Sequence, residues 1–443
     1  MKRLHVLPIL AGCLLLGLPA LHAQQTRIQY IRPNNQYGLN VFEPTKADSG
    51  SFHGLKVAIG GNFTQDFQAL SDRNTAEAVM NNGTNVNQLL KLTDGLNLAM
   101  ANLNLDVQLA DGIRLNLTTY LSTRHHQDTW VKGGYIQFDK LGFLNSPGIN
   151  KLMNHLTLKI GDFDPDYGDA HFRRTDGGNS IHNPFVENYI MDAFTTEVGG
   201  ELMYQSNQGV FALAGLSDGE LNPSVTASST VDAATGNPVK ADPAVHVKLG
   251  YDKQLSTDVR FRLSGSAYLD KSSPSNTLYW GDRTGSHYFL VMENTSASSS
   301  NNAWSGRFNP LFSQEVHAVM INPFLKYKGL EFLGTYEHVS GRTSKETSLR
   351  SDNQLVADLV YRFPAEKQHF WIGARYNTLG AELPGISGTV HINRVAGSAG
   401  WFMTPNVMMK VEYVDQVYSN FPSTDIRSGG EFNGLMVEAS VGF

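Results

Sequence analysis

F-N-G-L-M-V-E-A-S-V-G-F, residues 432–443, is the stretch that decides the fold. From Leu435 onward, apolar residues occupy the odd positions and mostly polar residues the even ones. Strict alternation of this kind is typical of a β-strand with one apolar face. The printed sequence closes on Phe443, and an aromatic residue there suits the girdle of a transmembrane β-barrel at the membrane interface. The stretch therefore predicts a membrane-barrel strand, with the last strand of a soluble sandwich as the alternative.

The first 23 residues have the form of an export signal. A basic Met1–Arg3 segment precedes an almost wholly apolar run at 4–21, and Ala23 offers a small residue for cleavage. Residues 1–23 are therefore predicted to be a signal peptide that is removed. A lipoprotein-type processing site at Cys13 is the alternative, although the apolar run continues past it. Cleavage after Ala23 would remove the single cysteine and leave no disulfide framework.

Composition restricts the classes of protein that fit an exported chain. The formal charge is −6, and loss of Lys2 and Arg3 would make it −8. Charged residues make up 17%, whereas about a quarter is usual in soluble proteins. No apolar run after residue 23 reaches the ~18 residues of a transmembrane helix. Two classes remain, a soluble exported protein and an outer-membrane barrel.

Alternating segments followed by turn residues recur along the rest of the chain. Residues 24–54 lack a sustained period and are predicted to be an N-terminal extension, which tucks into the barrel mouth or lies at its periplasmic rim. Residues 55–443 are predicted to form the transmembrane barrel. Its sixteen predicted strands are 55–70, 103–109, 113–121, 130–139, 155–162, 195–205, 210–217, 244–252, 258–269, 316–328, 330–340, 353–363, 369–379, 391–403, 407–418 and 432–443.

The connections between these strands are alternately short and long. This is typical of barrels with short periplasmic turns and long extracellular loops. Connection 125–129 is short on the long side, and 140–154 is long on the short side. Two further segments, 278–281 and 287–292, would raise the count to eighteen if they crossed the membrane. The fold class predicted is therefore an all-β, antiparallel transmembrane barrel of about sixteen strands, with eighteen left open.

A sheet in a membrane must close, because each unpaired backbone group in hydrocarbon costs several kcal/mol. At sixteen to eighteen strands the lumen is too wide for wall side chains to fill it, so water is expected to occupy it.

If the apolar face of each strand points outward, the charged residues on the opposite face point into the lumen. More of these residues are basic than acidic. We interpret this excess as a mild preference for anions, since wall charges act on ions across a confined lumen. The alternative is that these charges only pair across strands. The predicted pore-lining residues are Arg114, Lys159, Lys248, Arg260, Arg262, Arg362, Arg375, Arg394, Lys410, Asp106, Glu197, Glu201, Asp358, Glu412 and Glu438.

The connection after the fifth predicted strand is long, polar and rich in charges. A loop this long in a compact fold is usually functional or disordered. We expect it to fold inward and constrict the pore; an extracellular cover or a subunit contact is the alternative. Its predicted constriction residues are Asp162, Asp164, Asp166, Asp169, His171, Arg173, Arg174 and Asp176.

Two segments resemble known functional motifs but depart from them at decisive positions. The aspartates of 162–166 resemble a calcium loop, but Pro165 interrupts it and Arg173 stands where the closing Glu belongs, so only a looser cation site stays open. Residues 215–219 fit G-x-S-x-G without the helix that a nucleophile elbow requires. No zinc-type histidine spacing or phosphate loop occurs. The sequence therefore predicts neither an enzyme nor a cofactor, metal or nucleic-acid partner.

The chain resembles Gram-negative outer-membrane porins of the phosphate-selective O/P type. The resemblance lies in Y-G-L-N-V-F-E from Tyr37, residues 54–70, W-V-K-G-G-Y-I-Q-F from Trp130, and 167–176 with N-P-F-V-E-N-Y-I from Asn183. It implies a sixteen-stranded homotrimer in the outer membrane that takes up solutes passively, with one loop folded into the pore. That family uses an arginine ladder and a lysine cluster, whereas here the basic residues are interleaved with Glu and Asp and no lysine-rich run is present. The predicted partners are therefore small hydrophilic or anionic solutes, together with the lipid of the outer membrane.

Two other functions stay open. A transporter of hydrophobic compounds would have about fourteen strands and a plugging N-terminus, for which 24–53 is the candidate. A barrel enzyme would need a catalytic Ser/His or Asp/His pair at the strand tops.

Overall fold

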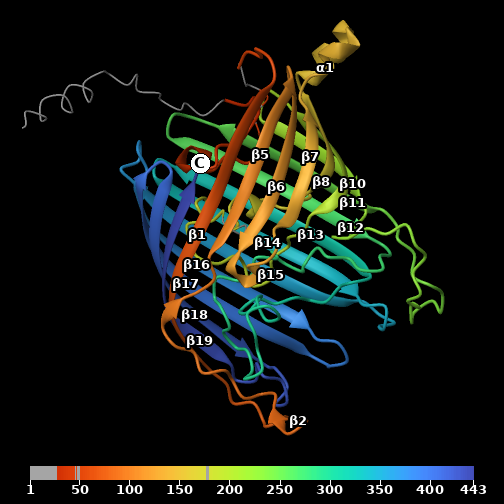
Figure 1. The fold of residues 1–443 in the computed structure, drawn as a ribbon, viewed down its shortest axis with the longest axis vertical. Coiled ribbons are helices and arrows are strands. Elements are labelled where there is room, and N and C mark those ends of the chain that lie inside the picture. The colour runs from red at the N-terminus through yellow and green to blue at the C-terminus, as the bar shows by residue number, and fades with distance from the viewer. Residues whose placement is uncertain (1–26, 45, 47–49, 176–178) are drawn as a thin grey trace, which may run out of the picture.

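The computed structural model describes residues 27–44, 46, 50–175 and 179–443, and within them the chain forms one closed antiparallel barrel (Figure 1). The strands are β1 Lys56–Arg73, β2 Met80–Asn81, β3 Thr84–Asn85, β4 Gly95–Leu96, β5 Met100–Ala110, β6 Ile113–Ser122, β7 Trp130–Phe138, β8 Leu156–Phe163, β9 Glu197–Gln205, β10 Val210–Ser217, β11 Ala244–Gln254, β12 Val259–Asp270, β13 Glu315–Tyr327, β14 Leu330–Arg342, β15 Arg350–Phe363, β16 Phe370–Glu382, β17 Thr389–Thr404, β18 Val407–Ser419 and β19 Glu431–Gly442. The helices are α1 Pro147–Met153 and the short 3-10 segments η1 Gln36–Gly38, η2 Thr123–His125, η3 Gly142–Leu144 and η4 Ala170–Phe172.

The barrel closes because β1 pairs with strands at both ends of the sheet. Its first half pairs with β5 and its second half with β19, both antiparallel. From β5 to β19 each strand pairs with the next one along the chain, which gives sixteen wall strands; β4 adds only a short pairing to β1. The sixteen predicted strands all coincide with wall strands within a few residues. The two extra segments, 278–281 and 287–292, are not strands, which excludes the count of eighteen.

Side chains alternate between an apolar outer face and a polar inner face. On β11, Val245, Val247 and Leu249 are exposed, whereas the intervening His246 and Lys248 are buried. Aromatic rings stack around the outside at the ends of β15–β17, where Phe370 lies 5.7 Å from Phe363 and 6.0 Å from Trp401 between ring centroids. An apolar belt with an aromatic girdle on a closed sheet is the form that a bilayer requires. The protein is therefore located in the outer membrane of a Gram-negative cell.

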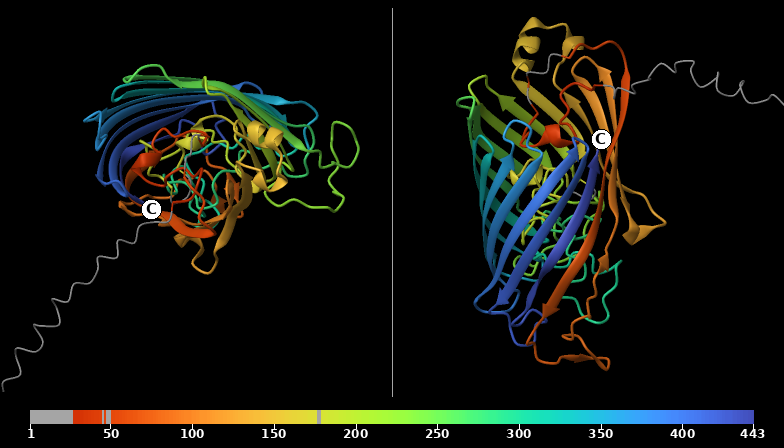
Figure 2. Two further views of the ribbon diagram at one scale, coloured as in Figure 1. Left: turned by 90° about the horizontal axis from the view of Figure 1, so that it is seen from above. Right: turned by 90° about the vertical axis from the view of Figure 1, so that its left-hand side faces the viewer.

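The two ends of the barrel differ. One end carries the C-terminus and mostly short turns, such as those between β5 and β6 and between β17 and β18 (Figure 2). One connection at this end is long, namely 139–155, which contains η3 and α1. At the opposite end, the connection 123–129 is short. We take the short-turn end as periplasmic. No helix among the described residues has the length and apolar content of a membrane-spanning helix.

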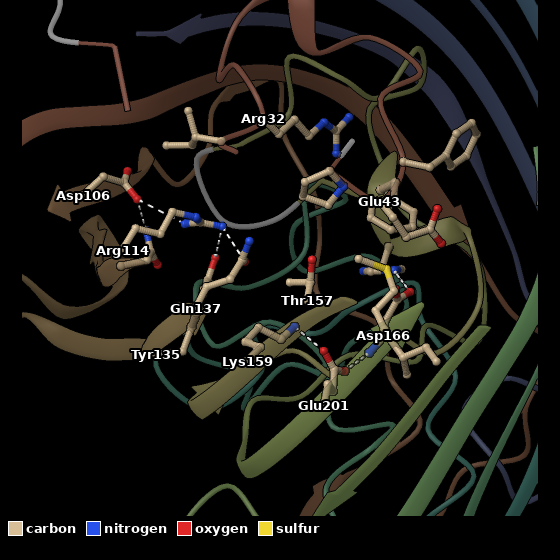
Figure 3. A pocket seen from close by; sticks show the side chains of 18 of the residues that line it. Arg32, Glu43, Asp106, Arg114, Tyr135, Gln137, Thr157, Lys159, Asp166 and Glu201 are labelled. Atoms are coloured by element: carbon tan, nitrogen blue, oxygen red, sulfur yellow. Dashed lines mark hydrogen bonds and ion pairs between the residues drawn. The ribbon is translucent and has the colours of Figure 1, made fainter. Parts of the chain in front are cut away.

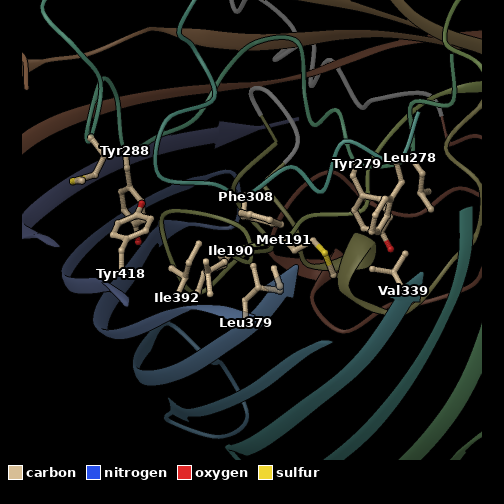
Figure 4. Close-up of a cluster of buried hydrophobic side chains, with 14 of the residues drawn as sticks. Ile190, Met191, Leu278, Tyr279, Tyr288, Phe308, Val339, Leu379, Ile392 and Tyr418 are labelled. Atoms are coloured by element: carbon tan, nitrogen blue, oxygen red, sulfur yellow. The ribbon is translucent and has the colours of Figure 1, made fainter. Parts of the chain in front are cut away.

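Two long extracellular connections fold back into the barrel. Residues 164–175 and 179–196 of one connection and 271–314 of the other lie inside the barrel (Figure 2, left), and they pack mainly on the side of β12–β19. They bury an apolar cluster against the inner wall, in which Ile190 and Met191 of one loop and Phe308 of the other meet Leu379 and Ile392 of the strands (Figure 4). The expectation of a lumen left to water is therefore wrong for this side, because apolar side chains from the loops occupy it.

The described part of the N-terminal extension, residues 27–44, lies in the periplasmic mouth. The Gln36 backbone N–H donates to the carbonyl of Pro405 in the β17–β18 turn at 2.8 Å. Phe42 is 2% exposed and packs edge-on against Phe324 of β13, with 5.3 Å between ring centroids. Of the two placements that the sequence left open, the structure has the extension inside the mouth. The predicted signal peptide, 1–23, lies outside the described residues.

Candidate functional site: the barrel interior

All fifteen predicted pore-lining residues lie on the inner face of the wall. Lys159 and Arg260 are half-buried, and the other thirteen are buried. Their elements are β5 for Asp106, β6 for Arg114, β8 for Lys159, β9 for Glu197 and Glu201, β11 for Lys248, β12 for Arg260 and Arg262, β15 for Asp358 and Arg362, β16 for Arg375, β17 for Arg394, β18 for Lys410 and Glu412, and β19 for Glu438.

Basic residues of β16–β18 hold the first inward loop by its backbone. Arg375 forms a two-bond pair with Asp358 at 2.7 and 2.8 Å, and also donates to the carbonyl of Glu187 at 2.8 Å. Arg394 donates to the carbonyl of Asn188 at 2.6 Å, and Lys410 to that of Phe185 at 2.7 Å. These cations are thus occupied by the protein itself, and their first effect is to position the loop.

A second group of charges fixes the N-terminal extension and the loop to the wall together. Glu43 accepts two hydrogen bonds from Arg262, at 2.6 and 2.7 Å, and lies 3.1 Å from Lys248. Asp169 of the loop accepts two from the same Arg262 at 2.7 Å and lies 2.9 Å from Lys248. Two cations on neighbouring strands therefore bind one carboxylate from each segment. Arg260 pairs with Asp252 at 2.6 Å and donates to the carbonyl of Asn40 at 2.8 Å.

The predicted constriction residues separate into three groups. Asp162 lies on β8, and the prediction that it belongs to the loop is wrong because the strand continues to Phe163. The loop proper begins after that residue and carries Asp164, Asp166, Asp169, His171, Arg173 and Arg174 inside the barrel wall. Asp176 lies outside the described residues.

Within the loop, charges are paired at close range. His171 donates to Asp166 at 2.8 Å and lies 3.4 Å from Asp164, while Lys248 donates to Asp166 at 2.6 Å. Burial lowers the pKa of His171, but its bonds to the two carboxylates outweigh burial and raise the pKa to about 9. These aspartates thus already face cationic side chains, which leaves little room for the looser cation site.

The two loop arginines also find partners. Arg173 donates to Glu331 of β14 at 3.0 Å and to Asn40 of the extension at 2.5 Å. Arg174 pairs with Asp192 at 2.5 Å. Both therefore tie the loop to its surroundings.

The inner wall holds more acidic residues than the sequence assigned to it. Among the described strand residues, five further carboxylates are buried on this face, against three further basic groups. The carboxylates are Asp66, Asp270, Glu331, Glu337 and Asp352, and the basic groups are Lys132, Arg342 and Arg350. With these residues added, the excess of basic residues on which the anion preference was based falls from three to one.

A cavity of about 270 Å³ remains between the extension, the loop and the β5–β10 wall (Figure 3). Arg32, Arg114 and Lys159 face it together with Glu43, Asp106, Asp166 and Glu201, and amides, Tyr135 and Phe172 complete the lining. Lys159 pairs with Glu201 at 2.5 Å, whereas Arg114 is 3.7 Å from Asp106 and leaves its Nε without a partner. Among the described residues, the Arg32 guanidinium donates only to the carbonyl of Gly38, at 2.8 and 3.0 Å. Burial, with repulsion by Arg173, lowers the pKa of Arg32 to about 9.

One group of metal-ligating residue types meets among the described residues, where β1 closes on β19. Asp66 and Glu438 are cross-strand partners, and His287 of the second loop lies 2.6 Å from Asp66 and 3.5 Å from Glu438. The Lys410 ammonium is 2.7 Å from Glu438. Two carboxylates therefore face two cationic side chains, an arrangement that ties the loop to the closing seam.

The G-x-S-x-G segment forms no nucleophile elbow. Ser217 ends β10, no helix follows it, and its hydroxyl donates to Glu197, while Tyr268 donates to the same carboxylate at 2.8 Å. In the described part of the chain, no histidine bonds to this serine.

Sequence reasoning missed the second inward loop, 271–314, as part of the site. One signal is present in the sequence: the apolar segments 278–281 and 287–292, which the sequence leaves open as possible strands, are too short to cross a membrane. Leu278, Tyr288 and Val291 are at most 2% exposed in the lumen. Apolar runs too short for strands within a polar loop indicate burial inside the barrel.

Comparison with known proteins concerns the fold. No protein-family model matches the chain, and no curated protein matches it. Among solved structures, an anion-selective porin from Comamonas acidovorans is similar with a TM-score of 0.50 and 8% identity, over 88% of this chain and 100% of that one. The outer membrane channel DcaP of Acinetobacter baumannii is similar with a TM-score of 0.50 and 12% identity, over 89% and 99%. At such identities the likeness shows a shared barrel fold and nothing about solutes.

Proposed function

We propose that this protein is an outer-membrane channel for passive diffusion of small hydrophilic solutes, and that it is not an enzyme. The observation that carries the proposal is an asymmetry of the inner wall. On β5–β8, polar side chains such as Asn104, Asn116 and Tyr135 are only half-buried. On β13 and β16, the inward-facing Asn322 and Asn377 are fully covered by the loops. Solute and water would therefore pass along β5–β9, through the cavity.

Reconstitution in a planar bilayer tests the channel. We expect discrete, ohmic steps from the purified full chain and none from a heat-denatured sample. A protein that inserts but conducts no ions under any voltage, and releases no small sugars from liposomes, would contradict the proposal.

The mild anion preference remains part of the proposal, supported by the cavity rather than by the wall as a whole. Of the cationic groups at the cavity, Arg32 donates to a backbone carbonyl and to no carboxylate among the described residues, whereas Arg114 donates to Gln137 at 2.7 Å and lies 3.7 Å from Asp106. Reversal potentials in a KCl gradient measure it directly, and clear cation selectivity would refute it. Phosphate selectivity and the homotrimer rest on the resemblance to the O/P-type porins alone; competition by phosphate and native mass measurement test them.

Transport of hydrophobic compounds is a second candidate, favoured by one observation. The N-terminal extension occupies the mouth and an apolar cluster occupies the lumen. The strand count of sixteen differs from the fourteen expected for such a transporter. Uptake of an alkane or long-chain fatty acid into proteoliposomes, without ion conductance, would favour this function over the first.

A further inference from the structure

An aromatic pocket opens among the extracellular loops, away from the periplasmic cavity. It has a volume of about 230 Å³ and lies between 191–193 of the first inward loop and 279–309 of the second. Its lining consists of Asp192, Tyr279, Trp280, Gly281, Trp304, Arg307, Phe308 and Asn309. Pockets for drug-sized ligands are usually about 300–1,000 Å³, so this one suits a solute of about one ring.

The rings present apolar faces rather than polar edges. The Trp304 Nε1 donates to the carbonyl of Asp282 at 2.7 Å, and the Tyr279 hydroxyl donates to Glu337 at 2.6 Å. The Arg124 guanidinium lies 4.4 Å from the centre of the Trp304 ring and stacks on it. Trp280 is 51% exposed beside these buried rings, which places one large aromatic side chain at the entrance. Flat apolar walls of this kind stack on planar or ring-shaped solutes.

Gly281 permits this arrangement. Its φ of +82° is unfavourable for other residues, and a Cβ there would lie 2.8 Å from Arg307 and 3.3 Å from Trp304. The backbone therefore approaches both side chains closely, and the polar group of Arg307 is brought into the aromatic wall.

Hydrogen-bonding groups in the pocket are only partly used. The Arg307 side chain is 6% exposed, and its Nε has no partner among the described residues. The other guanidinium nitrogens are engaged, at 3.4 Å from Asp192, 3.4 Å from Glu187 and 3.1 Å from the carbonyl of Gly285. Asn309 uses its side-chain oxygen on the Leu311 N–H at 2.7 Å, which leaves its amide N–H groups as donors.

This combination favours an uncharged hydroxylated ring over a carboxylate. Binding a carboxylate well takes both arms of a guanidinium fork, and here the terminal nitrogens of Arg307 are already occupied. Asp192 lies in the same wall and would repel a second anion. A hydroxyl can accept from the Asn309 amide and donate to the Asp192 carboxylate, while the C–H face of its ring lies on an indole.

We propose that this pocket is a capture site for one pyranose ring of a neutral sugar at the extracellular entrance. The inference goes beyond the channel function and does not depend on it, because binding requires no flow. The site would raise the local concentration of sugar at the mouth without selecting by charge.

Calorimetric titration of the detergent-solubilised full chain with methyl α-D-glucoside tests the proposal. We expect weak, saturable binding with a Kd in the millimolar range. Trp280→Ala should weaken it at least tenfold and Trp280→Phe should retain most of it. Trp401→Ala, which removes an exposed indole from the lipid face, should leave Kd within twofold. The heat-dependent gel shift of each variant shows that it is folded.

Three results would overturn the proposal: no saturable heat with the glucoside, equal binding to the folded Trp280→Ala variant, or binding of benzoate in place of the glucoside. The last result would assign the pocket to aromatic anions. Because the measurement needs no ion current, a protein that binds sugar but does not conduct would refute the channel and leave this site intact.

Discussion

Replacing Glu43 by Gln should release the N-terminal extension from the periplasmic mouth. The carboxylate accepts two bonds from Arg262 and lies 3.1 Å from Lys248, all in the buried interior. Bonds to charged groups contribute about 1.5–3 kcal/mol each. In the variant, Arg262 and Lys248 still pair with Asp169, and the glutamine oxygen can still accept one hydrogen bond. The loss of docking free energy is therefore expected at the low end of the range for two such bonds, about 3 kcal/mol. That corresponds to a shift of roughly 100-fold in the docking equilibrium, since 1.4 kcal/mol is tenfold.

Single-channel recording measures this shift as the fraction of time spent in the largest conductance state. Deletion of 27–44 sets the upper limit that the Glu43→Gln variant should approach. Glu366→Gln changes an exposed glutamate on the periplasmic turn after β15 and serves as the control, with the conductance of the original chain. If the deletion opens the channel while Glu43→Gln behaves like the control, the assignment of this ion pair as the anchor is wrong. If the deletion itself changes nothing, the extension does not obstruct the route.

Three further perturbations follow from the structure. His171 has its pKa raised to about 9, so the stability it gives to the loop is complete below about pH 6.5 and is lost as pH rises through 9; conductance should increase between pH 8 and 10, and His171→Gln should lack that step. Arg375→Ala leaves Asp358 as a buried charge without its partner and should cost about 3–5 kcal/mol, seen as a lower temperature for the gel shift of the folded barrel, while an unchanged temperature would show that water already solvates the pair. Leu249→Arg puts a charge on the lipid face and should cost about 2–4 kcal/mol near the midplane; Leu249→Ala should assemble normally, and equal yields of both variants in the outer membrane would contradict the outward assignment.

Every-other-residue patterning was sufficient to predict the wall. In the last strand, the apolar residues Leu435, Val437 and Ala439 alternate with polar ones such as Glu438 and Ser440. Because successive residues of a strand point to opposite faces, this alternation predicts which side chains face lipid. Strand number, antiparallel order and the inward direction of all fifteen predicted wall charges followed from it. The alternation lies within each strand, so it can be recognised without knowing which strands pair with it.

The interior was decided by tertiary contacts alone. Nothing local to 278–292 tells a short apolar strand from a loop segment buried in the lumen, because both read as brief apolar runs. Glu43 and Asp169 meet at Arg262 across more than a hundred residues, and Asp66 meets His287 only once β1 closes on β19. Long-range pairing leaves no periodic mark in the sequence. The sequence by itself therefore determined the barrel, through the alternation of apolar and polar residues in its strands. The arrangement inside the lumen was decided by the tertiary structure, because it depends on which loops fold back against the wall.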